Sequence, residues 1–174
     1  MVNAVKEPPV KNIVLTGMPG AGKSTVGVLL AKTLKRPFLD TDLLIQTTSD
    51  RYLQDIINDE GMDAFLDIEA ATILNLRVTG AVIATGGSVV YREAAMRHLA
   101  ATGIIVYLDA PCRTIQGRLS NIATRGIARK PGQDICDLYA ERYPLYRRYA
   151  DITLSTDENA LEAVVTHLTR VLHG

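Results

Sequence analysis

The sequence feature that most constrains this chain is the glycine-rich stretch Gly17–Ser24, which reads GMPGAGKS. It fits the pattern G-x-x-x-x-G-K-[ST], in which successive backbone N–H groups curve around phosphate oxygens. Residues 13–15 precede the stretch as an apolar run that is typical of a buried strand, and apolar residues at helical spacing follow it. We therefore predict a phosphate-binding loop between a strand and a helix, with an ordinary glycine-rich turn as the alternative.

Each residue type in this loop has a chemical reason to be there. Glycine takes backbone angles that a side chain would block, so the loop can close tightly around a phosphate. Lys23 can reach the β and γ phosphates of a nucleotide, and the Ser24 hydroxyl can bind Mg²⁺. The helix that begins at Ser24 adds the positive end of its dipole. The residues expected to contact the nucleotide are Gly17, Gly20, Ala21, Gly22, Lys23, Ser24 and Thr25.

The composition excludes several classes of protein. With 174 residues, of which 47% are apolar, the chain can bury a core and is too apolar to be disordered. Its 19 basic and 19 acidic residues cancel, so no long-range field attracts nucleic acid or an anionic membrane. We expect neither of these partners. We expect residues 1–174 to form a single, monomeric domain with a loose lead-in over 1–10.

The cysteines and histidines show no metal-ligand spacing. Cys112 and Cys136 lie far apart in the sequence and are expected to be free thiols in a reducing compartment. Residues 1–11 lack the apolar run of a signal peptide, and we expect no membrane-spanning segment. The expected location is therefore the cytoplasm.

Apolar patterning predicts strands that alternate with helices. This alternation is typical of an α/β fold with an open parallel sheet and helices on both faces. In such sheets, ligands bind beyond the carboxyl ends of the strands. The strands are expected at 11–16, 37–40, 81–84, 104–108 and 152–154. The helices are expected at 24–35, 43–58 with a break near 48–50, 61–78, 93–101, 111–121, 134–149 with an interruption at Pro144, and 161–172.

Two short motifs follow the second and third strands and should lie beside the glycine-rich loop. Of the carboxylates Asp40 and Asp42, one could hold Mg²⁺ and the other could accept a proton from an attacking hydroxyl. The alternative is that Asp42 only caps a helix and Asp40 is a surface residue. Gly86 and Gly87 would let a ligand approach the backbone closely, or they form a plain turn in which Ser88 caps the next helix.

Arginines gather in and around a polar segment at 122–133. This segment could be a mobile lid, with Arg125 reaching the transferring phosphoryl group, or it could be a solvated loop. Arg118 and Arg142 lie on the helices that flank it. Arginine is well suited to bind a carboxylate with two hydrogen bonds, so Arg142 is a candidate for acceptor recognition.

Taken together, the chain resembles the shikimate kinases from about residue 11 to 172. The motifs that carry the resemblance are Gly17–Ser24, Asp40-Thr41-Asp42, Ala84-Thr85-Gly86-Gly87 and Arg142-Tyr143-Pro144-Leu145-Tyr146-Arg147. The resemblance implies a five-stranded parallel sheet in the order 2-3-1-4-5. It also implies the use of ATP and Mg²⁺, and transfer of the γ-phosphoryl group to a hydroxyl of shikimate in the route to chorismate and the aromatic amino acids.

The resemblance also implies roles for single residues. Lys23 and Ser24 match the family's phosphate and Mg²⁺ residues, and Asp40 matches its metal-side carboxylate. Asp42 matches the carboxylate that engages the acceptor hydroxyls, and Arg142 matches an arginine that binds the acceptor's carboxylate. The remaining matches are Gly86 and Gly87 to the acceptor-binding glycines, Arg125 to the lid arginine and Arg118 to an arginine near adenine.

The acceptor side departs from the family pattern at three positions. Where the family has a glutamate and an arginine on one helix, this chain has Met62 and Leu66, which make that helix face apolar. Glu69 thereby lacks the arginine it would have neighboured, and Ser88 replaces a third glycine. A hydrogen bond to a charged group contributes about 1.5–3 kcal/mol, so the missing arginine should weaken shikimate binding about tenfold to a hundredfold.

Three explanations account for these departures. The chain phosphorylates shikimate with another arginine, Arg51 or Arg92 by position. It phosphorylates a different small hydroxylated acceptor. Or it binds nucleotide without phosphorylating shikimate. The phosphate-binding loop, Asp42 and Arg142 favour a kinase, because a protein that only binds nucleotide needs neither Asp42 nor Arg142.

Overall fold

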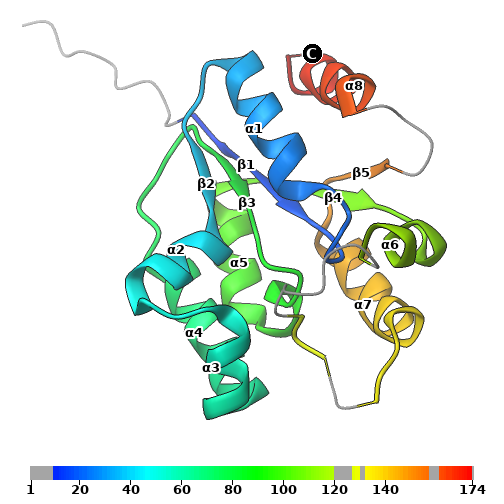
Figure 1. Cartoon of the computed structure of the whole chain (residues 1–174). Helices are drawn as coiled ribbons and strands as arrows, with labels where there is room; N and C mark the ends of the chain where they lie inside the picture. The colour runs from blue at the N-terminus through cyan, green and yellow to red at the C-terminus, as the bar shows by residue number, and fades with distance from the viewer. Residues whose placement is uncertain (1–9, 120–126, 130–131, 157–160, 174) are drawn as a thin grey trace, which may run out of the picture.

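A computed structural model describes residues 10–119, 127–129, 132–156 and 161–173 of the chain. Five parallel strands form one sheet in the order β2-β3-β1-β4-β5 (Figure 1). This is the order that the family resemblance implied. The strands are β1 (Asn12–Thr16), β2 (Phe38–Asp40), β3 (Val82–Ala84), β4 (Gly103–Asp109) and β5 (Ile152–Ser155).

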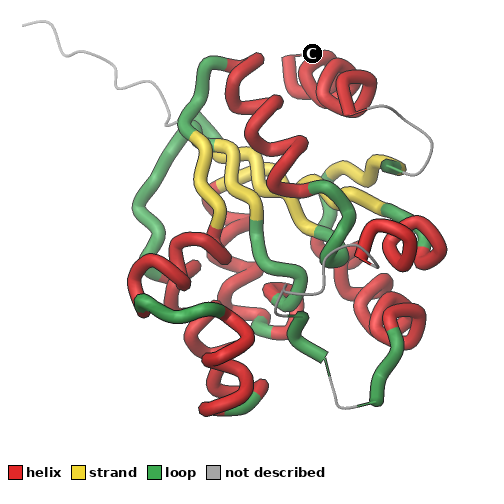
Figure 2. Tube along the Cα trace, in the orientation of Figure 1, coloured by secondary structure: helices red, strands yellow, loops and turns green. Residues whose placement is uncertain are grey.

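Helices cover both faces of the sheet (Figures 1 and 2). One face carries α1 (Lys23–Leu34) and α8 (Leu161–His173), and the other carries α5 (Glu93–Thr102) and α7 (Ile135–Tyr149). The described residues also include α2 (Thr41–Ser49), α3 (Leu53–Glu60), α4 (Met62–Leu74), the short 3₁₀ helix η1 (Val89–Tyr91) and α6 (Cys112–Leu119). None of these helices is both long enough and apolar enough to cross a membrane.

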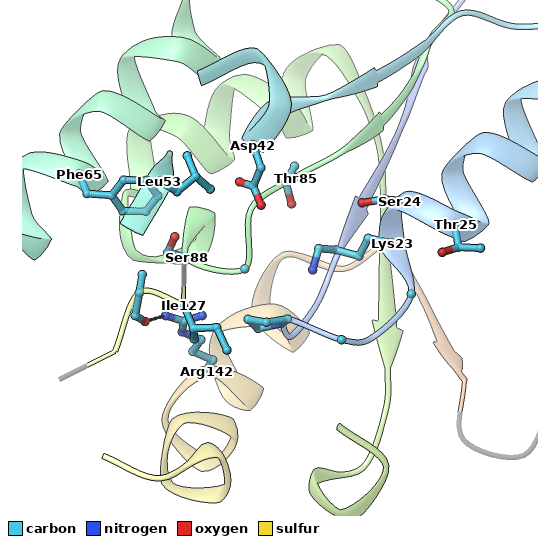
Figure 3. Close-up of a pocket in the computed structure, with 15 residues that line it drawn as sticks. Lys23, Ser24, Thr25, Asp42, Leu53, Phe65, Thr85, Ser88, Ile127 and Arg142 are labelled. Atoms are coloured by element: carbon cyan, nitrogen blue, oxygen red, sulfur yellow. Dashed lines mark hydrogen bonds between the residues drawn. The ribbon is translucent and has the colours of Figure 1, made fainter. Parts of the chain in front are cut away.

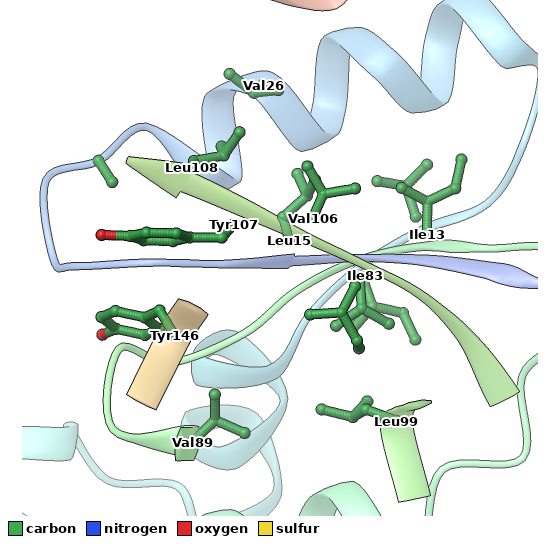
Figure 4. Packing of buried hydrophobic residues seen from close by; sticks show 14 of the residues in the cluster. Ile13, Leu15, Val26, Ile83, Val89, Leu99, Val106, Tyr107, Leu108 and Tyr146 are labelled. Atoms are coloured by element: carbon green, nitrogen blue, oxygen red, sulfur yellow. The ribbon is translucent and has the colours of Figure 1, made fainter. Parts of the chain in front are cut away.

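The main core lies between the sheet and these helices. Figure 4 shows Val26 of α1 on one side of the strands, and Leu99 of α5 with Tyr146 of α7 on the other. Strands β1 and β3 are buried along their whole length, as expected for parallel strands that are covered on both faces. A rigid core of this kind fixes the strand ends, where the candidate site residues begin.

Each predicted helical range contains helix among the described residues; two ranges differ in detail, and the short helix η1 was not predicted. The break predicted near 48–50 is confirmed: α2 ends at Ser49, because the φ of 53° at the next residue, Asp50, cannot continue a right-handed helix, and α3 begins at Leu53. Helix α4 ends at Leu74, four residues earlier than predicted. Pro144 does not interrupt α7, which runs continuously through it.

The expectation of two free thiols is wrong. Cys112, at the start of α6, and Cys136, in the first turn of α7, form a disulfide with a Cα–Cα distance of 5.4 Å. The fold brings the two helix starts together although 24 residues separate them in sequence, and sequence spacing does not report such proximity. The cysteines therefore no longer argue for a reducing compartment.

Reduction of this disulfide should lower the stability of the protein. The bond closes a loop of 24 residues, so its loss should decrease the free energy of unfolding by about 3 kcal/mol. Thermal unfolding with and without dithiothreitol measures the effect. The double variant Cys112→Ser/Cys136→Ser is the control, because its unfolding midpoint should not respond to the reductant. An unchanged midpoint in the reduced wild type would contradict the pairing.

Candidate active site

The glycine-rich loop joins β1 to α1, as predicted. Gly20 and Gly22 have φ values of 81° and 98°, which disfavour any residue with a side chain. A Cβ built on Gly17 would lie 2.5 Å from the backbone oxygen of Leu108, so this position also excludes a side chain. The Lys23 amine donates to the backbone oxygens of Gly17 and Met18 at 2.8 and 2.9 Å. The loop is therefore closed around its own lysine, a geometry suited to an anion.

Ser24 and Asp40 meet at the start of α1 and the end of β2. The Ser24 hydroxyl donates to Asp40 Oδ2 at 2.6 Å. Asp40 Oδ1 accepts from the backbone N–H groups of Asp42 and Leu43, so Asp40 and not Asp42 caps α2. The alternative in which Asp42 caps the helix and Asp40 is a surface residue is therefore wrong. The side chain of Asp42 instead lines a cavity beside the glycine-rich loop.

The Gly86-Gly87 pair follows β3 in a space too small for side chains. A Cβ on Gly86 would lie 2.6 Å from Asp42 Oδ1 and closer still to Glu69 Oε1, and one on Gly87 would lie 2.8 Å from Pro19 Cδ. The Gly86 N–H donates to the Thr41 hydroxyl at 3.1 Å. Ser88 makes no side-chain cap of the following helix. The pair is thus a point of close approach between the glycine-rich loop, α2 and α4, and more than a plain turn.

Arg142 of α7 is fully buried next to this pair, since a Cβ on Gly87 would lie 3.2 Å from its Nη1. Its Nε donates to the Tyr91 hydroxyl at 3.1 Å, its Nη2 donates to the backbone oxygen of Ala128, and its guanidinium lies 4.9 Å from the centre of the Tyr91 ring. Arginine stays charged at any ordinary pH, even when buried. The arrangement fixes a cation at the edge of the cavity.

One cavity brings these groups together (Figure 3). Lys23 enters it from the start of α1, Asp42 from α2 and Arg142 from α7. A cation, a carboxylate and a second cation that surround one space can hold a phosphate donor beside an acidic, hydroxylated acceptor. The lining residues are Pro19, Gly20, Gly22, Lys23, Ser24, Thr25, Asp42, Leu53, Phe65, Thr85, Gly87, Ser88, Ile127, Ala128 and Arg142.

Of the two other predicted arginines, Arg118 and Arg125, the structure describes only the first. Arg118 of α6 donates to the backbone oxygens of Gly20 and Thr156 at 3.1 and 2.8 Å, which ties α6 to the loop and to the end of β5. Arg125 lies outside the described residues, as does much of the candidate lid at 122–133. Residues 127 and 128 of that segment do line the cavity.

The helix that carries the sequence departures, α4, presents an apolar surface next to the cavity. Leu66 is 6% exposed and belongs to a small apolar cluster with Phe65 and Ala128, against which Met62 packs. The arginines proposed as replacements are engaged elsewhere. Arg51 pairs with Asp59 and Glu60, Arg92 pairs with Asp63 and Asp67, and neither lines the cavity.

Sequence reasoning missed the residues that hold the predicted ones in place. Tyr91 and the backbone of Ala128 accept from Arg142, and the buried Thr41 accepts from Gly86. The sequence could have pointed to Thr41, because this residue lies between Asp40 and Asp42. Nothing in the sequence ties Tyr91 or Ala128 to Arg142, because the fold alone brings them together.

The comparisons with known proteins agree with this geometry. A family model described as Shikimate kinase matches residues 19–173. The Shikimate kinase of Pseudomonas fluorescens is 41% identical over 158 residues, which cover 89% of this chain and 92% of that protein. A structure of the shikimate kinase from Acinetobacter baumannii in complex with shikimate has a TM-score of 0.87 at 32% identity, covering 94% of this chain and 93% of that one. The Aquifex aeolicus enzyme gives 0.79 at 30% identity, covering 94% and 96%. The chain therefore belongs to the shikimate kinase family, whose members are phosphotransferases that act on a hydroxyl group.

Proposed function

We propose that this chain transfers the γ-phosphoryl group of ATP to a hydroxyl of shikimate and releases ADP and shikimate 3-phosphate. The proposal rests on one cavity that Lys23, Asp42 and Arg142 line together. Family membership supports the reaction, and the fixed cation of Arg142 supports an acceptor with a carboxylate.

On the donor side, the loop and the start of α1 would bind the phosphates of ATP. Lys23 would leave its two backbone partners for phosphate oxygens, and Gly17, Gly20, Ala21, Gly22 and Thr25 would supply backbone groups around them. Arg118 would lie near adenine. The short contact between Ser24 and Asp40 fits a Mg²⁺ site, because Mg²⁺ uses one or two protein oxygens together with phosphates and water. When bound, the ion would neutralise charge that develops on the phosphates.

On the acceptor side, the carboxylate would lie on Arg142 and the hydroxyls on Asp42. Asp42 would orient the attacking hydroxyl and accept its proton. The Gly86-Gly87 pair would let the acceptor approach the backbone closely. Arg125 would contact the transferring phosphoryl group from the lid.

A direct assay tests this proposal. Purified protein with ATP, Mg²⁺ and shikimate should release ADP and form one phosphate ester per ADP. Turnover no higher than in the absence of shikimate would reject shikimate as the acceptor.

A second candidate is a kinase for another small hydroxylated acceptor. The apolar surface around Leu66 and Met62 favours it, because the second arginine expected for shikimate is absent there. A panel of small alcohols and hydroxy acids, scored by ADP release, distinguishes the two functions. A nucleotide-binding protein without transferase activity would show ATP binding and no turnover with any member of the panel.

Restoring an arginine at Leu66 should improve shikimate binding. The side chain would reach the region beside Ala128 and Arg142, next to Glu69, and would add a contact to the acceptor's carboxylate. We expect Leu66→Arg to lower the KM for shikimate about tenfold with little change in the KM for ATP. Leu66→Gln serves as the polar control without charge. A KM for shikimate that stays the same or rises would mean that the acid is held elsewhere.

The cytoplasmic location, the monomeric state and the single-domain organisation stay predictions. Gel filtration with light scattering would test the second of these: a mass near the 18.9 kDa of the chain indicates a monomer.

A further inference from the structure

The buried carboxyl group of Glu69 has no role in the proposed phosphoryl transfer. Glu69 lies on α4, is 1% exposed, and neither of its oxygens has a hydrogen-bond partner among the described residues. A buried carboxylate without a partner is unfavourable, so such a group either faces a counter-charge or keeps its proton. The identity of its neighbours decides between the two.

The nearest charged neighbour is negative. Asp42 of α2 and Glu69 of α4 face each other across Gly86, since a Cβ there would collide with an oxygen of each. Burial and the charge of Asp42 disfavour the charged form of Glu69 more than its other neighbours favour it, which are the Ser88 hydroxyl after β3, Arg142 of α7 and Lys23 of α1. Tyr146 of α7 also faces Glu69 and is neutral at ordinary pH.

The counter-charge that could have balanced Glu69 is missing from α4. Leu66 lies three residues before Glu69, on the same side of the helix, and is apolar. Arg92, the cation next to this helix, pairs with Asp63 and Asp67 instead. The acceptor region therefore contains two carboxyl groups, Asp42 and Glu69, and two cations, Lys23 and Arg142. These cations are also needed to bind the phosphates and the acceptor's carboxylate.

We propose that Glu69 is a positioning residue that stays neutral, so that Arg142 meets the acceptor's carboxylate without a competing anion and Asp42 remains the charged carboxyl group for the acceptor hydroxyls. The inference rests on the proposed function, because it concerns an acidic acceptor in the same cavity. Because Leu66 supplies no positive charge beside Glu69, a proton on Glu69 removes the negative charge that an arginine at position 66 would have balanced.

This arrangement should make acceptor binding sensitive to mildly alkaline pH. Burial, followed by the charge of Asp42, raises the pKa of Glu69 to about 8. As the pH rises through this value, the group ionises and repels both Asp42 and the acceptor's carboxylate. The KM for shikimate should then rise with pH while the KM for ATP, which binds at the loop, changes much less.

The test compares the wild type with Glu69→Gln, which keeps the shape and stays neutral. Between about pH 7 and 9 the wild-type KM for shikimate should rise about tenfold, whereas that of Glu69→Gln should change less than about threefold. Asp67→Asn is the matched control, because it removes an exposed carboxylate from the same helix and should keep the wild-type profile. A parallel rise of KM in wild type and Glu69→Gln would overturn the proposal.

A second measurement follows the proton without any acceptor. Folding raises the pKa of Glu69 from 4.5 to about 8. The contribution of this group to the free energy of unfolding therefore falls as the pH rises from about 4.5 to 8, and it is constant above that. The unfolding midpoint of Glu69→Gln should therefore exceed that of the wild type by an amount that grows over this range. A pH-independent difference would overturn the neutral state. If shikimate is not turned over at any pH but the difference in unfolding midpoint still grows with pH, the proposed function is rejected and the neutral state of Glu69 stands.

Discussion

Replacing Lys23 with alanine should lower kcat by about a hundredfold to a thousandfold, the cost of removing one charge-stabilising donor from a site that excludes water. In the structure the Lys23 amine is 2.8 and 2.9 Å from two backbone oxygens of its own loop, so it is held at the position where the phosphates would bind. Charge that develops on the transferring phosphoryl group would lose this partner.

The measurement is kcat from ADP release at saturating ATP and acceptor. Lys32→Ala is the matched control, since Lys32 is an exposed lysine on the same helix and should leave kcat unchanged. Thermal unfolding of both variants shows whether the fold is intact. A Lys23→Ala enzyme that keeps more than a tenth of the wild-type kcat would remove Lys23 from the transfer step.

Replacing Arg142 with lysine should raise the KM for shikimate about tenfold to a hundredfold while kcat falls much less. Lysine keeps the charge but cannot present the planar pair of donors that matches a carboxylate. It also cannot reproduce the two contacts that hold the guanidinium, to the Tyr91 hydroxyl and the Ala128 backbone. The acceptor would then meet a mobile point charge.

The control for this variant is Arg148→Lys, an exposed arginine near the end of the same helix. The KM for ATP should stay within about threefold of the wild-type value in both variants, because Arg142 lies on the acceptor side. An equal rise in the KM for ATP and for shikimate would indicate general disruption of the cavity, and an unchanged KM for shikimate would remove Arg142 from acceptor binding.

The parts of the fold that follow from local chemistry were predictable from the sequence. Apolar runs such as 104–108 indicate buried parallel strands, and a glycine-rich stretch between a strand and a helix indicates the geometry of a phosphate-binding loop. Their alternation then determines that the loop, the aspartates and the Gly86-Gly87 pair share one edge of the sheet.

Contacts between residues far apart in the sequence were not predictable in the same way. Spacing could not reveal that Cys112 and Cys136 lie 5.4 Å apart, because the proximity depends on how two helices pack. The sequence did show that Glu69 lacks a neighbouring arginine. Only the structure shows that Glu69 is buried against Asp42. This burial is the reason why the missing arginine bears on the protonation of Glu69.

The identity of the acceptor is the central element of the proposed function. The direct measurement is kcat/KM for shikimate and for each member of a panel of small alcohols and hydroxy acids, with the phosphorylated product identified by mass and ³¹P NMR. The proposed function predicts that shikimate has the highest kcat/KM of the panel and gives a single phosphate ester. Another acceptor that is better by about tenfold or more, or no ester with shikimate at all, would contradict it.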